Sequence, residues 1–163
     1  MIRATNAITM AVMLLSGSVF AQPPTYTENP NDAFVKLLEG QYLRYIDAGT
    51  RGDVNAYLKT RGIETVKKMA AVSPNSLKRM AVMDLIPSES QFVRLDSSGI
   101  VARLIYQKLS AEKSQWDAIV FVKEDGEWKI DRLASVLHAG NKPKNSDGLN
   151  ELLEHRQAKI SKN

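Results

Sequence analysis

The sequence contains no cysteine, which excludes disulfide bridges, thiol catalysis and thiolate metal sites. It has only two histidines, His138 and His155, and they do not form the H-x-x-x-H spacing of a helical zinc site. We interpret both as surface residues rather than as metal ligands or general bases. The sequence therefore predicts no metal site and no bound cofactor.

Clustered positive charge is also lacking. The 22 lysine and arginine residues are offset by 18 aspartate and glutamate residues, which gives a formal net charge of +4. The basic residues are scattered and do not form the stripe with interleaved aromatics that is typical of nucleic-acid binders. There is no G-x-S-x-G elbow and no glycine loop for phosphates. We therefore expect no nucleic-acid partner, and no motif assigns a catalytic residue.

No apolar stretch reaches the ~20 residues that a membrane-spanning helix needs. The apolar run over residues 7–15 follows the basic Arg3 and precedes Val19-Phe20-Ala21, which places small residues at the −3 and −1 positions of a cleavage site. This pattern predicts a signal peptide over residues 1–21, cut between Ala21 and Gln22; the alternative is an uncleaved N-terminal anchor. The expected product is periplasmic or secreted, with no membrane span after cleavage.

The first half of the remaining chain reads as helical. Residues 22–28 form an extended leader, after which Asn29 is placed to cap and Pro30 to begin a long amphipathic helix. Gly49 and Gly52 are predicted to end that helix, and Asp53 is predicted to cap the next one. The predicted helices cover about 30–48, 53–61, 63–72 and 75–85.

After Pro87 the apolar residues recur with a period of two, which is typical of strands. Strands are predicted over residues 91–96 and 100–109, and a hairpin is predicted within residues 115–133, with Asp125-Gly126 at its turn. Helices followed by consecutive strands indicate an α+β fold with a four-stranded antiparallel sheet. The domain is expected to span residues 29–137, followed by a linker over 138–148 and an amphipathic tail helix over 149–161. That tail helix either docks on the domain or meets a partner.

The alternation within the hairpin also assigns its side chains to two faces. The face toward the helices is expected to carry Trp116, Val120, Trp128 and Ile130. Asp117 and Asp131 then face away from the helices, which removes them as a catalytic pair. We interpret Arg103 and Arg132 as ion-paired or solvated sheet residues rather than as ligands of an anion.

Two segments, YLRYIDAGTRGDVNAYLK (residues 42–59) and FVKEDGEWKIDRL (residues 121–133), resemble the nuclear transport factor 2-like superfamily. The resemblance spans roughly residues 33–136. It implies a cone-like fold in which N-terminal helices pack on a strongly curved antiparallel sheet, and members often pair through the open sheet face.

The best-known enzymes of that superfamily are ketosteroid isomerases. These enzymes use a carboxylate base together with a tyrosine and a protonated aspartic acid that bind an oxyanion. Tyr42 or Tyr45 resembles that tyrosine in placement only. The family's base usually follows the second helix, but here the corresponding region, residues 60–72, holds Glu64 as its only acid. The resemblance therefore supports the fold and leaves isomerase activity without its base.

These observations favour an exported, non-catalytic binding or assembly module. Side chains expected to line an interior pocket are aromatic residues and methionines: Tyr42, Tyr45, Tyr57, Met69, Met80, Met83 and Tyr106. Apolar side chains expected to form a homodimer interface on the sheet face away from the helices are Val101, Ile105, Ile119, Phe121 and Leu133.

Two other functions stay open on the sequence: a protein that binds a small apolar ligand, and an isomerase or dehydratase in the same fold. A filled interior would favour assembly, and an open one would favour a ligand. A pocket that holds Glu64 or Asp117 beside a tyrosine would favour the enzyme.

Overall fold

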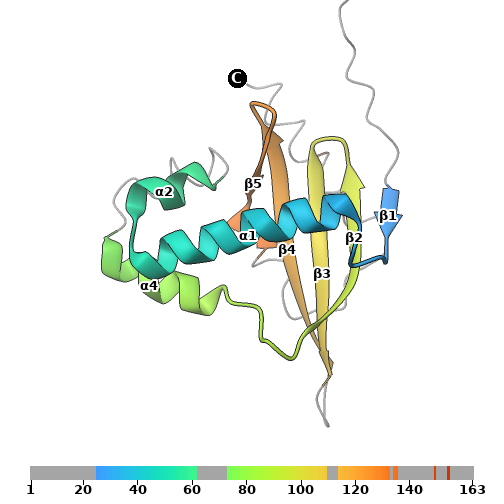
Figure 1. The fold of residues 1–163 in the computed structure, drawn as a ribbon, viewed down its shortest axis with the longest axis horizontal. Helices are drawn as coiled ribbons and strands as arrows, with labels where there is room; N and C mark the ends of the chain where they lie inside the picture. Colours follow the sequence, from blue (N-terminus) through green and yellow to red (C-terminus); the bar gives the residue numbers. More distant parts are fainter. Residues whose placement is uncertain are drawn as a thin grey trace, which may run out of the picture.

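The protein is an α+β structure with its helices on one face of an antiparallel sheet. The computed structural model describes residues 25–61, 73–109, 114–132 and 134–135, together with residues 149 and 154. The five strands lie in the order β1-β2-β3-β4-β5, and the long helix α1 crosses them (Figure 1). The predicted arrangement of N-terminal helices on an antiparallel sheet is confirmed. The predicted strong, cone-like curvature and the four-strand count are wrong, because the sheet has five strands and is not strongly curled.

The additional strand is β1, Thr25–Thr27, which lies in the segment predicted to be an extended leader. It pairs antiparallel with β2, Gln91–Ser98, with Tyr26 opposite Asp96. Three residues are too few to show a period of two, and the pairing partner lies far along the chain. The strand therefore exists because β2 offers an unpaired edge, and no local pattern marks it.

Helix α1 spans Ala33–Arg51 and begins later than predicted. Its cap is Asp32, whose side chain accepts a hydrogen bond from the backbone N–H of Phe34 at 2.8 Å. The predicted cap, Asn29, instead accepts from the N–H of Asn31 at 3.0 Å, which forms a turn before the helix. The helix ends at Gly52, whose φ of 71° places it in the left-handed region.

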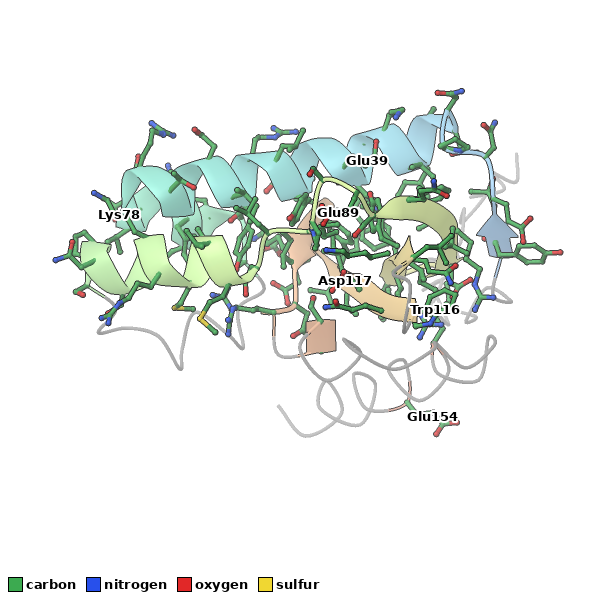
Figure 2. The ribbon with its side chains drawn as sticks, turned by 90° about the horizontal axis from the view of Figure 1, so that it is seen from below. Glu39, Lys78, Glu89, Trp116, Asp117 and Glu154 are labelled. Carbon is green, nitrogen blue, oxygen red and sulfur yellow. The ribbon has the colours of Figure 1, made fainter. Side chains whose placement is uncertain are left out.

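Two shorter helices lie beside α1. Helix α2, Val54–Lys59, is capped by Asp53 as predicted, since the Asp53 carboxylate accepts from the N–H of Ala56 at 3.0 Å. Helix α4, Pro74–Met83, is capped by Ser73 and runs alongside α1 (Figures 1 and 2). The helix predicted over residues 63–72 lies outside the described residues.

The close approach of α1 and α4 explains Gly49, which was predicted to end the first helix. Gly49 lies inside α1 and is buried. A Cβ atom at this position would stand 2.7 Å from the Cβ of Ala81 on α4, closer than real side chains pack. Gly49 therefore permits helix packing, and Gly52 alone ends the helix.

The remaining strands match the predicted ones closely. Strand β3 is Val101–Leu109, β4 is Ser114–Glu124 and β5 is Glu127–Ile130. The hairpin turn consists of Asp125 and Gly126, with φ values of 52° and 80°. Positive φ at both central residues is the requirement of a type I′ turn, which matches the twist of paired strands.

This two-residue turn decides which side chains of the hairpin share a face. Lys123 pairs with Trp128, and Phe121 pairs with Ile130. Because cross-strand partners point the same way, odd-numbered residues of β4 share a face with even-numbered residues of β5. The Trp128 ring packs 5.2 Å from that of Phe34 on α1, measured between centroids, so this shared face is the one toward the helices.

Several predicted positions on β4 are therefore wrong. Ile119 and Phe121 pack in the core beneath the helices, whereas Val120 packs on the opposite face. Asp117, which shares the parity of Ile119, also lies on the helix side. The prediction followed β4 and β5 as one uninterrupted alternation, and the turn shifts that alternation by one residue.

Apolar residues are buried on both faces of the sheet. The core between helices and sheet includes Val35, Leu38, Tyr45, Tyr57, Leu95, Leu104, Ile119, Phe121 and Ile130. The core on the other face consists of Val101, Val120, Val122, Ala134 and Leu149. Leu149 and Glu154 are helical, whereas the rest of the predicted tail helix, the linker and the signal peptide lie outside the described residues.

The residues predicted to form a dimer interface are buried within the single chain. Val101, Ile105 and Phe121 are at most 1% exposed, and Ile119 is 6% exposed; Leu133 lies outside the described residues. Val101 and Ile105 do lie on the face away from the helices, as the pairing of β3 shows. A single chain does not test the homodimer, which stays a prediction.

Candidate functional site

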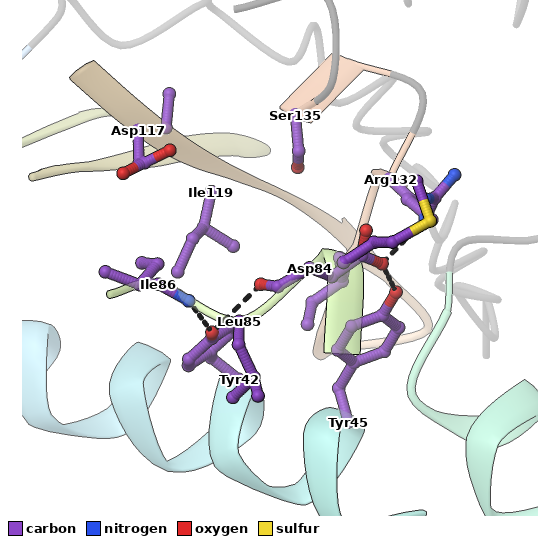
Figure 3. A pocket seen from close by; sticks show the side chains of 12 residues that line it. Tyr42, Tyr45, Asp84, Leu85, Ile86, Asp117, Ile119, Arg132 and Ser135 are labelled. Atoms are coloured by element: carbon purple, nitrogen blue, oxygen red, sulfur yellow. Dashed lines mark hydrogen bonds and ion pairs between the residues drawn. The ribbon is translucent and has the colours of Figure 1, made fainter. Parts of the chain in front are cut away.

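A pocket of about 110 Å³ lies between helix α1, the segment that follows α4, and strands β4 and β5 (Figure 3). Its lining comes from five parts of the chain and combines apolar side chains with three charged ones. The lining residues are Tyr42, Tyr45, Met83, Asp84, Leu85, Ile86, Asp117, Ala118, Ile119, Ile130, Arg132 and Ser135.

One wall of the pocket is the segment after α4, held against α1 by Tyr42. The Tyr42 hydroxyl donates to the backbone carbonyl of Asp84 at 3.0 Å and accepts from the N–H of Ile86 at 2.8 Å. Burial raises the pKa of Tyr42, so the hydroxyl keeps the hydrogen that it donates. The Tyr42 hydroxyl thereby satisfies the hydrogen-bonding needs of two backbone groups in a segment without regular secondary structure, which fixes the position of this wall.

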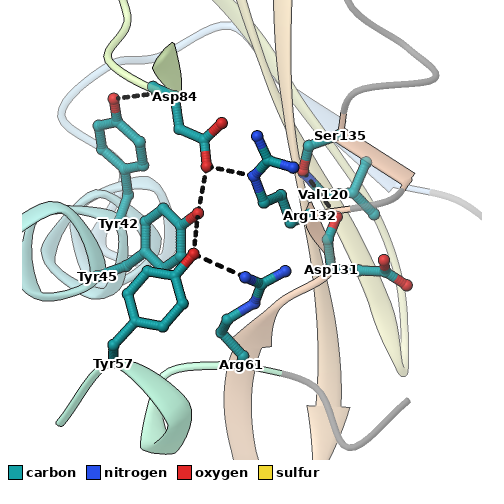
Figure 4. A network of polar contacts seen from close by, with 9 residues as sticks. All are labelled: Tyr42, Tyr45, Tyr57, Arg61, Asp84, Val120, Asp131, Arg132 and Ser135. Carbon is teal, nitrogen blue, oxygen red and sulfur yellow. Dashed lines mark hydrogen bonds and ion pairs between the residues drawn. The ribbon is translucent and has the colours of Figure 1, made fainter. Parts of the chain in front are cut away.

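The Asp84 side chain anchors a hydrogen-bonded chain of five residues (Figure 4). Arg132 Nε contacts Asp84 Oδ2 at 2.6 Å, and the Tyr45 hydroxyl donates to the same oxygen. The Tyr45 and Tyr57 hydroxyls are 3.0 Å apart, and Arg61 Nη1 donates to the Tyr57 hydroxyl at 2.7 Å. Since Tyr45 donates its hydrogen to Asp84, Tyr57 donates to Tyr45, and all the hydrogen bonds of the chain lead from both ends toward the Asp84 carboxylate.

Burial and charge around these five residues favour the protonation states that their hydrogen bonds require. Burial, and then the negative charge of Asp84, raise the pKa of Tyr45, which therefore stays a donor at neutral pH. The hydrogen bond to Asp84 raises the pKa of Arg132. Together these contacts join α1, the end of α4 and the residues after β5 at one end of the pocket.

Asp117 lies on the opposite side of the pocket from Asp84 and Arg132 (Figure 3), on strand β4. Its carboxylate accepts no hydrogen bond from the described part of the chain, and its Oδ2 atom is buried without a partner. Burial raises the pKa of Asp117, and the charge of Lys108 opposes that shift. A buried carboxylate oxygen without a hydrogen-bond donor lowers the stability of a folded protein.

The predicted pocket residues are only partly brought together. Tyr42, Tyr45 and Met83 line the pocket. Tyr57 supports it through Tyr45 without lining it, and Tyr106 donates instead to Glu39 on α1 at 3.0 Å. Met80 does not line the pocket, and Met69 lies outside the described residues.

The charged lining residues were not predicted as site residues. Asp84 carried one usable signal, because an acid at the C-terminal end of a helix opposes the helix dipole and needs a cationic partner. Arg132 was interpreted as an ion-paired residue, which the contact with Asp84 confirms. Asp117 was excluded by the wrong face assignment.

The other polar residues considered from the sequence have structural roles where they are described. Arg103 forms a buried ion pair with Asp96 at 2.7 Å across β2 and β3, on the sheet face away from the helices. His138 and His155 lie outside the described residues. Within the described ranges, no group of three potential metal ligands occurs, and no helix there is both long and apolar enough to cross a membrane.

Comparison with known proteins identifies no relative. No protein-family profile, curated protein or solved structure matches this chain. The resemblance to the nuclear transport factor 2-like superfamily therefore stays a prediction.

Proposed function

We propose that this protein binds a small, mainly apolar molecule in the pocket between α1 and strands β4 and β5. The proposal rests on one observation: the pocket is lined mainly by apolar side chains, and among them lies the carboxylate of Asp117, whose buried Oδ2 atom has no hydrogen-bond partner. Mostly apolar walls with a few orienting polar groups are typical of ligand pockets. An interior that served only packing would be filled by side chains instead.

The volume limits the size of the ligand. Pockets for drug-sized molecules usually measure about 300–1,000 Å³, whereas this one measures about 110 Å³. An apolar protein cavity of about 150 Å³ accommodates benzene. The enclosed part of the ligand is therefore about the size of benzene or smaller.

Proton transfer is a second candidate, because Asp117 shares the pocket with Tyr42 and Tyr45. A carboxylate whose pKa is raised by burial suits a general base. However, each tyrosine has a single hydroxyl hydrogen, and Tyr42 donates it to the Asp84 carbonyl while Tyr45 donates it to the Asp84 carboxylate. Neither tyrosine then has a hydrogen left for a substrate oxyanion, so binding is the better supported function.

A fragment screen by NMR tests the proposed function. Small aliphatic and aromatic compounds are added to the ¹⁵N-labelled protein, and we expect shifts of the backbone signals of Ile86 and Ile119. Leu85→Trp, at a lining position, fills the pocket and should abolish these shifts. The matched control is Val82→Trp, which adds the same ring at an exposed position outside the lining and should preserve them. A screen in which no compound shifts the pocket signals would refute the proposal.

A further inference from the structure

We propose that the ligand is a small organic cation, an amine on a short apolar body, whose ammonium group binds the carboxylate of Asp117. This inference rests on the proposed binding function and specifies its ligand class. It follows from the charge of the lining, from the state of Asp117 and from the chemistry of the remaining walls.

The lining residues carry one more negative charge than positive charge. Three of them are charged: Asp84, Arg132 and Asp117. Asp84 and Arg132 neutralise each other through their contact at 2.6 Å, which leaves the charge of Asp117. Because a charge in a partly desolvated site interacts strongly, a ligand of charge +1 complements this lining and an anion is repelled.

No side chain of the described part of the chain supplies that positive charge. The cation whose field acts on Asp117 is Lys108, but the Lys108 ammonium forms its ion pair with Glu89. The Asp117 carboxylate therefore keeps a buried oxygen with no hydrogen-bond donor. A ligand ammonium offers three N–H donors and a full charge, which satisfies this oxygen better than a neutral hydroxyl does.

The body of the ligand is limited by the other walls. Leu85, Ile86 and Ile119 contribute aliphatic surface to the lining of the pocket that holds Asp117 and the Asp84–Arg132 pair (Figure 3). Both tyrosine hydroxyls are already bonded within the protein, so the space between the two charged ends favours hydrocarbon. A branched alkylamine of a few carbons matches this arrangement and the pocket volume.

Three compounds of nearly the same shape test the ligand class: isobutylamine, isobutanol and isobutyrate. Each is titrated into the ¹⁵N-labelled protein at neutral pH while the signals of Ile86 and Ile119 are followed. We expect the amine to bind about tenfold or more tightly than the alcohol, since a charge-assisted hydrogen bond replaces a neutral one. The carboxylate should not bind measurably.

Two variants assign the preference to Asp117. Asp117→Asn should reduce the affinity for the amine to about that for the alcohol, while the alcohol binds as before. Asp125→Asn is the matched control, because it removes one negative charge from the same hairpin at an exposed turn residue that tolerates asparagine. The control should bind the amine as the unchanged protein does.

The outcomes separate the two proposals. If none of the three compounds shifts the pocket signals but another fragment of the screen does, the binding function stands and the ligand class is wrong; if no fragment does either, both are wrong. If the alcohol or the carboxylate binds as tightly as the amine, the binding function stands and the cation preference is wrong. If Asp117→Asn keeps its affinity for the amine, the binding function stands and the assignment of the ammonium site to Asp117 is wrong.

Discussion

Asp117 is an acid on the helix-facing side of β4, where the next two residues on the same face are the apolar Ile119 and Phe121. Burial raises its pKa above the value of 3.8 in an unfolded chain. Between those two pKa values the folded protein binds more protons than the unfolded chain, so the free energy of unfolding falls as pH rises through this range. The ionised carboxylate is thus a cost to stability that is present at neutral pH and absent below about pH 3.

Replacing this acid should therefore stabilise the protein. We expect Asp117→Asn to increase the free energy of unfolding by up to about 1 kcal/mol at pH 7, the lower end of the cost of an unpaired buried polar atom. The gain should vanish near pH 3, where both states carry a protonated carboxyl. Urea denaturation at the two pH values measures it, with Asp125→Asn as a control that should show no such pH dependence. A variant that is less stable at pH 7 would show that Asp117 has a stabilising partner.

For the hairpin of β4 and β5, the strands and the turn could be predicted from the sequence, whereas the faces of its side chains could not. Alternation and the Asp125-Gly126 pair predict two strands and their turn, because both are local properties of the chain. The direction in which each side chain points also depends on how the turn pairs the strands. For that reason the existence of the hairpin was predicted correctly, whereas the side occupied by Asp117 was not. A similar ambiguity affected the start of α1, where Asn29 and Asp32 are both good caps.

The contact between α1 and α4 depends on Gly49. Adding a methyl group there removes the entropic cost of a helical glycine but forces the two helices apart. We expect Gly49→Ala to lower the free energy of unfolding by about 1–2 kcal/mol. Gly40→Ala, in the same helix where nothing surrounds the added Cβ, should raise it by about 1 kcal/mol. Chemical denaturation compares the two, and equal gains would mean that the helices separate without cost.

Apolar side chains are buried on both faces of the sheet within the single chain. The apolar residues on the face away from the helices were predicted to pack against a second copy, because strand alternation marks apolar residues without identifying what covers them. Tyr42, Tyr45 and Met83 were predicted for the pocket because aromatic residues and methionines are common in such sites. Asp84 and Arg132 were not predicted as pocket residues. They lie 48 residues apart in the sequence, and a local sequence pattern cannot show that two such distant residues are in contact.

A substitution at Leu149 measures how much the core on the sheet face away from the helices stabilises the fold. Its side chain is 0% exposed and packs with Val101, Val120 and Val122. We expect Leu149→Ala to lower the free energy of unfolding by about 3 kcal/mol, the usual cost of a truncated core leucine. Leu109→Ala, at a leucine that is 66% exposed, should change it by less than about 0.5 kcal/mol. Equal small effects in both variants would place Leu149 outside the cooperative unit.

Strand β1 has a consequence for the order in which the chain folds. Thr25 bonds to Ser97, 72 residues further along, so the first strand has no partner until most of the domain has been made and β2 has formed. Closing so long a loop for three residues of pairing gains little until the rest of the sheet is in place. We therefore expect the N-terminal strand to join last, with its amides protected later than those of β3 in pulsed hydrogen exchange. The first strand in the sequence is thus expected to be the last strand to pair during folding.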